Sequence, residues 1–98
     1  MTTNRRVHFS DEFFDRLDSL LPEERGADGT PSVTDFLVFE APRIRDRLAA
    51  DMLTATMATS LPDVRVYVNT GLMLTGVVAY LRYDEYAVEV YWLSIDFG

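Results

Sequence analysis

The residue types available for chemistry in this chain are few, and they set the first limits on its function. The 98 residues contain no cysteine and a single histidine, His8. Disulfide scaffolds, thiol chemistry and cysteine–zinc clusters are therefore excluded, and one histidine cannot build a multi-histidine metal site. General acid–base catalysis needs a group that titrates near neutrality, and His8 lies in a short predicted strand as a surface residue. We therefore expect no metal and no cofactor.

The charged residues limit the partners. Sixteen acidic residues oppose nine basic ones, which gives a formal net charge of −7 at pH 7. Such a field repels phosphate backbones, so we expect no direct binding of nucleic acid. All nine basic residues are arginine, so no lysine is available for Schiff-base or phosphate-loop chemistry.

Length and hydropathy predict one small domain. Ninety-eight residues with 48% hydrophobic content are enough for one core, so we expect a single α+β domain over residues 1–98. The N-terminal sequence MTTNRRVHF has no apolar run, and the apolar stretch at residues 72–81 is too short to cross a bilayer. We therefore predict a soluble cytoplasmic protein that does not bind membranes.

The N-terminal half is predicted to hold one short strand and two helices. Residues 6–9 alternate polar with apolar, as in a strand, and Ser10 is placed to cap a helix over residues 11–21. Residues 25–32 have the composition of an exposed loop. A second helix begins near Ser32 with a capping-box pattern and is expected to kink near Pro42. The alternative for the apolar run within that helix is a buried strand.

The C-terminal half is predicted to be a three-strand antiparallel meander. In residues 64–69 the valines share one face, which is typical of a strand with one covered side. Residues 72–83 and 87–97 are apolar on both faces, which indicates a central position, a β-bulge or a second covered face. Turns are expected at residues 69–71 and at 84–85. The predicted fold is a short N-terminal strand, two helices and then this meander.

This order of elements resembles the RelE/ParE superfamily of small toxins from bacterial toxin–antitoxin pairs. The sequence VHFSDEF at residues 7–13 resembles the family's first strand running into its first helix. VVAYLRY at residues 77–83 resembles the strand that usually carries an arginine and a tyrosine, and VEVYWLSI at residues 88–95 lies where the family places its last core strand. The resemblance covers nearly the whole chain.

The chain departs from the members of that family that cut mRNA. Those members are typically basic and use arginines, lysines and a tyrosine or histidine late in the sheet, whereas this chain is acidic and its last strand ends in SIDF. The resemblance leaves Arg82, Tyr80, Tyr91 and Arg65 as the only candidates for a catalytic site. Packing and solvation at the sheet rim explain the same residues.

Three functions follow from these observations. The first is a RelE/ParE-like toxin-type module that binds a protein partner, either an antitoxin-like protein or a cellular target, and does not cut RNA. The second is a ribosome-dependent or free mRNA endoribonuclease that uses Arg82 with Tyr80 or Tyr91. The third is an acidic phage or plasmid decoy that occupies a nucleic-acid-binding protein through the carboxylates of the first helix.

The meander is also the predicted interaction surface. Two helices can cover only one face of it, so we expect some of its apolar side chains to form an exposed patch that binds a partner or a second copy of the chain. The candidates for this patch are Met73, Val77, Tyr91, Trp92 and Phe97.

Overall fold

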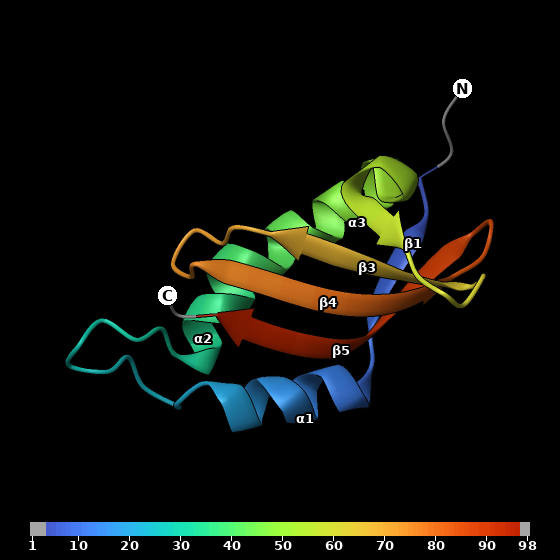
Figure 1. Ribbon diagram of the computed structural model, residues 1–98. Coiled ribbons are helices and arrows are strands. Elements are labelled where there is room, and N and C mark those ends of the chain that lie inside the picture. The colour runs from blue at the N-terminus through green and yellow to red at the C-terminus, as the bar shows by residue number, and fades with distance from the viewer. Residues whose placement is uncertain (1–3, 97–98) are drawn as a thin grey trace.

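The computed structural model describes residues 4–96 and has an α+β fold. A five-stranded sheet carries the helices on one side, with α1 running alongside β5 (Figure 1). The elements are β1 (Arg6–Phe9), α1 (Asp11–Leu20), α2 (Val33–Asp35), the π-helical turn η1 (Phe36–Glu40), α3 (Ala41–Ala55), β2 (Thr56–Ala58), β3 (Val64–Asn69), β4 (Gly76–Tyr83) and β5 (Ala87–Asp96). The predicted fold class and the antiparallel meander are confirmed.

The strand order in the sheet is β1-β5-β4-β3-β2. β1 pairs with β5 in parallel, and every other neighbouring pair is antiparallel. The short strand β2 was not predicted, because a three-residue segment after a helix leaves no periodic signal in the sequence. The pairing register shifts between Tyr80 and Leu81, which confirms a β-bulge in the apolar strand pair.

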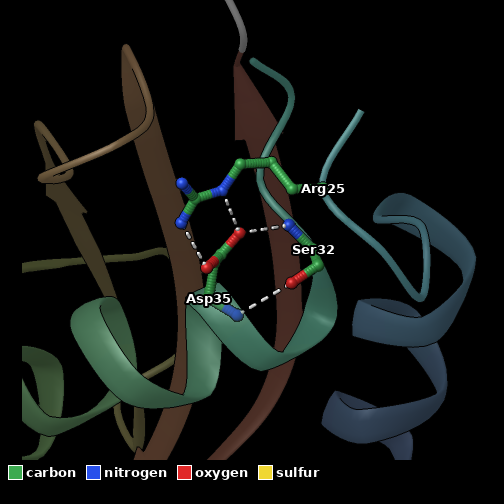
Figure 2. A network of polar contacts seen from close by, with 3 residues as sticks. All are labelled: Arg25, Ser32 and Asp35. Atoms are coloured by element: carbon green, nitrogen blue, oxygen red, sulfur yellow. Dashed lines mark hydrogen bonds and ion pairs between the residues drawn. The ribbon is translucent and has the colours of Figure 1, made fainter. Parts of the chain in front are cut away.

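Side chains cap both helical segments as predicted. The Ser10 hydroxyl accepts a hydrogen bond from the Phe13 amide, 3.2 Å away. Ser32 and Asp35 form a reciprocal capping box, in which each side chain accepts from the other residue's backbone amide. Arg25 adds two hydrogen bonds to the Asp35 carboxylate, at 2.7 and 3.0 Å (Figure 2). These hydrogen bonds connect the loop over residues 22–32 to the start of α2.

The second helix is irregular at two places: at the turn before Pro42, and at Asp51, whose backbone is not helical. A proline within a regular α-helix clashes with the carbonyl four residues earlier and donates no hydrogen bond. Here the turn before it widens to a π-helix, in which the Ala41 amide donates to the Phe36 carbonyl. Phe36 and Glu40 consequently point inward. Leu37 and Phe39, which belong to the same apolar run, are exposed instead.

The core lies between the helices and one face of the sheet. It is formed by Phe13, Leu17, Phe36, Ile44, Leu48 and Met52 from the helices and by Val77, Ala79, Leu81, Val88, Val90 and Leu93 from the strands. We call the opposite side of the sheet the open face. None of the helices in the described part of the chain covers it (Figure 1).

Candidate functional site

An apolar row crosses the open face from β2 to β5. Met57 pairs with Val66, Val66 with Tyr80, and Tyr80 with Trp92, so the four side chains occupy one continuous register across four strands. Met57 is 55% exposed, Trp92 39% and Tyr80 37%. Val66, between Met57 and Tyr80, is partly buried. Neighbouring apolar residues of which most are exposed mark interaction sites on proteins. We call these four residues the apolar row.

Val68 extends this surface along β3, whereas Val64, at the start of the same strand, is buried. Val68 pairs with Val78 next to the apolar row, and it is 50% exposed. The residue between the open-face valines, Tyr67, pairs with the buried Ala79 and faces the helices. The covered side of β3 therefore carries an aromatic residue between polar ones, and the valines share the side that no described helix covers. A sheet face with this composition has the character of a buried surface.

Trp92 is held at the end of the row by an arginine from α1. The Arg16 guanidinium carbon lies 4.0 Å from the centre of the indole ring, within the range of a cation–π interaction. Nε of Arg16 also donates a 3.1 Å hydrogen bond to the Leu93 carbonyl. β1 pairs with only the first part of β5, so this bond satisfies a carbonyl on the strand edge beyond β1.

A second arginine lies on an aromatic ring beside the row. Tyr91 is the extra residue of the β5 bulge, since Val90 pairs with Leu81 and Trp92 with Tyr80. The Arg82 guanidinium carbon is 4.0 Å from the centre of the Tyr91 ring, and Nη1 lies 3.3 Å from Oε1 of Glu89. Both arginine–aromatic pairs present planar donors toward the open face, where they are suited to bind carboxylates.

A shallow hollow of about 360 Å³ lies next to Arg82 at the β1 end of the sheet. His8 and Glu89, which are paired across β1 and β5, both line it. Asp84 lines it too, and its carboxylate accepts hydrogen bonds from the Tyr86 and Ala87 amides. These bonds lower the pKa of Asp84 from its usual range. The carboxylate therefore already serves as the hydrogen-bond acceptor of its own turn.

The structure brings together three of the four arginine and tyrosine candidates. Tyr80, Arg82 and Tyr91 are neighbours on the open face, as described above. Arg65 lies elsewhere, because it pairs with the buried Leu81 and so points to the opposite side. Its guanidinium donates to the Thr56 hydroxyl at 2.6 Å, to the Thr56 carbonyl at 2.9 Å and to the Leu53 carbonyl at 3.3 Å. It therefore binds the C-terminal end of α3.

Of the five predicted interface residues, only some lie on the open face. Tyr91 and Trp92 take part in the open-face contacts with arginine. Val77 is 2% exposed and belongs to the core, so it is not available to a partner. Met73 is partly buried in the loop between β3 and β4, and Phe97 lies outside the described residues.

Sequence reasoning missed Met57, Val66 and Val68 as parts of this surface. The alternation of residues 64–69 showed that the valines share a face. It did not show which face the helices cover, and the apolar side of a strand is ordinarily the covered one.

The part of the chain that the structure describes offers neither a metal-binding cluster nor a membrane-spanning helix. Residues 4–96 hold no group of three or more acidic or histidine side chains that could bind a metal ion. Over the same residues, no helix has the length and apolar composition needed to cross a membrane. Comparisons with models of protein families, with curated proteins and with solved structures found no match.

Proposed function

We propose that this protein is a RelE/ParE-like toxin-type module that acts by binding a protein partner through its open face. The observation that carries the proposal is the apolar row, which spans four strands on the side of the sheet that no described helix covers. Covering exposed apolar side chains with another protein removes them from water and is stabilising. The partner is either an antitoxin-like protein or a cellular target.

The dimensions of the row favour a partner α-helix. Neighbouring strands are spaced by about 4.8 Å, so the four residues extend over about 14 Å. One helical turn advances about 5.4 Å, and a helix of nine or ten residues covers the same length. A helix that crosses the strands can therefore place apolar side chains at i, i+3 or i+4, and i+7 against the row.

The charges near the row favour acidic residues beside the apolar stripe of that helix. The protein carries a net charge of −7, yet at this surface Arg16 lies on the ring of Trp92 and Arg82 on the ring of Tyr91. A guanidinium stacked on a ring keeps N–H donors in its own plane free to bind a carboxylate. The partner expected here is an amphipathic helix with glutamate or aspartate flanking its apolar stripe.

The element order supports the toxin-type assignment. The resemblance rests on a strand, a helix, a loop, a helix and an antiparallel meander, and the structure has this order. The acidic charge and the position of Arg65 at the end of α3 favour binding over RNA cleavage.

Site-specific photo-crosslinking tests the proposal. A benzophenone amino acid at Tyr80 should crosslink one cellular protein, and the crosslinks should fall on the apolar stripe of a helix in that protein. The same group at Leu61, which is exposed in the turn between β2 and β3, is the matched control and should not capture it. Crosslinking only to a second copy of the chain, or equally at both positions, would contradict the proposal.

A second candidate function is mRNA cleavage, favoured by one observation. The hollow is lined by His8, the only histidine of the sequence, together with Glu89 and Arg82. His8 and Glu89 are of the residue types that act as general acid and base, and Arg82 is of a type that binds phosphate. Incubation of RNA with the purified protein, alone and with ribosomes, tests this candidate. Cleavage that is lost in His8→Ala and Arg82→Ala would establish it, and intact RNA in both reactions would remove it.

A further inference from the structure

The π-helical turn η1 ends on a buried carboxylate. Glu40 is 3% exposed, and its Oε1 accepts a 2.7 Å hydrogen bond from the Leu72 amide in the loop between β3 and β4. Arg43, one turn along, approaches Oε1 only to 3.9 Å. The other oxygen, Oε2, is buried and has no hydrogen-bond partner among the described residues. A buried carboxylate oxygen without a partner is strongly unfavourable, so something must satisfy it.

Glu40 lines a small cavity, which limits what that partner can be. Arg43, Ile44, Tyr67, Thr70, Gly71 and Val77 line the rest of it. The volume of the cavity is about 10 Å³, which is close to the minimum that one water molecule requires. A water molecule also needs two or more polar partners, and Tyr67, Thr70 and Arg43 carry hydroxyl and guanidinium groups that can supply them.

We propose that this cavity is a binding site for a single water molecule, which donates a hydrogen bond to Oε2 of Glu40. Arg43 puts a positive charge at the cavity, which disfavours a metal cation as the occupant. Gly71 makes the site possible, because a Cβ at this position would overlap Oε2. The proposal is independent of the protein-binding function.

The water site would fasten the loop between β3 and β4 to the bent helix. That loop has only one backbone hydrogen bond of its own, from the Gly71 amide to the Leu74 carbonyl, among those described. Glu40 adds a bond to Leu72 through Oε1 and, through the water, a link to the other lining groups. The widened turn thus has a role in the fold, because it directs Glu40 inward beneath the loop.

A crystal structure at a resolution that shows ordered water tests the proposal. We expect one peak within hydrogen-bonding distance of Oε2 and of at least one other lining group. In Glu40→Gln the carbonyl can still accept from the Leu72 amide while the amide nitrogen faces the cavity, so the peak should persist. In Glu40→Met the peak should be lost, and hydrogen exchange at the Leu72 amide should accelerate at least tenfold because its acceptor is gone.

Two measurements can overturn the proposal even if Glu40→Met fails to fold. The first is the wild-type crystal structure. The proposal is wrong if the cavity there is empty or collapsed, or if it holds a peak whose occupancy follows the concentration of sodium or potassium. The second comes from the infrared difference spectrum between the wild type and Glu40→Gln. A carboxylate signal assigned to Glu40 supports the water site, whereas the signal of a protonated carboxylic acid would mean that Oε2 is itself a donor.

Discussion

Both faces of the sheet carry apolar side chains, but the helices cover only one of them. Leu93 and Trp92 are consecutive residues of β5, yet Leu93 is fully buried and Trp92 is substantially exposed. The same contrast separates Tyr67 from Val68 on β3. On one face the helices complete a core, and on the other face an apolar row, bordered by the pair of Arg82 and Glu89, is left to solvent. The comparison teaches that the composition of a strand shows which sides can be buried, while the helices decide which side is buried within the chain.

The largest expected effect comes from a charge on the covered face. Leu93→Asp should unfold the protein, because an unpaired carboxylate in the core costs several kcal/mol, which is comparable with the stability of a domain of this size. Urea denaturation followed by circular dichroism measures this. A variant that stays soluble and melts cooperatively near the wild-type temperature would show that Leu93 is not part of the core.

Arg16 contacts a residue of each face, Leu93 on the covered face and Trp92 on the open face. Its removal therefore tests how the two faces are linked. Arg16→Ala removes the hydrogen bond to the Leu93 carbonyl and the stack on Trp92, and we expect a loss of about 1 kcal/mol in the free energy of unfolding. Because Trp92 is the only tryptophan, its emission should also shift to longer wavelength as the ring becomes more exposed. Fluorescence-monitored urea denaturation gives both quantities.

Arg45→Ala is the matched control for Arg16→Ala. Arg45 and Asp46 form an exposed ion pair at 3.6 Å, which is expected to contribute little to stability. Equal losses in the two arginine variants would mean that the stack on Trp92 has no particular energetic role.

A charge on the open face should change stability much less than one on the covered face. Val68→Glu is expected to alter the free energy of unfolding by less than about 1 kcal/mol, because the side chain can remain in water. It should nevertheless abolish crosslinking from Tyr80, since it places a charge beside the apolar row. Retention of the full crosslink in a folded Val68→Glu protein would place the partner elsewhere.

The smallest expected effect depends on pH and involves the polar network at the start of α2. The bonds from Arg25 and from the Ser32 amide and hydroxyl keep the pKa of Asp35 well below its usual range. A lowered folded-state pKa adds stability that is fully present above about pH 4, where the unfolded carboxyl is also ionised, and that is lost as the pH falls toward the folded-state value. The Arg25 side chain is more than half exposed, so solvent screens the pair and the gain is small.

Comparison with Asp35→Asn isolates this contribution. The wild type should be more stable than the variant at pH 7, and the difference should shrink steadily as the pH is lowered from about 4. Urea denaturation at a series of pH values measures it. A difference that stays constant down to the acid limit would show that the carboxylate charge has no part in pinning the loop.

Much of the fold could be predicted because its signals are local. The Ser10 cap, the capping box of Ser32 with Asp35 and the bend at Pro42 each depend on residues within one or two turns. The candidate site could be predicted only in part. Tyr80, Arg82, Tyr91 and Trp92 were singled out and lie together, but the contacts that join Arg16 to Trp92 span residues far apart in the chain.

The sequence by itself determined the α+β class, the order of the main elements and the alternation of side chains along each strand, because each follows from neighbouring residues and backbone geometry. Only the tertiary structure decided that β1 pairs in parallel with β5, that β2 extends the sheet and that the valines of β3 face away from the helices. Alternation is symmetric between the two sides of a strand, so it cannot tell which one the helices will cover. The burial of Glu40 was likewise decided by tertiary structure, because it depends on a loop more than thirty residues away in the sequence.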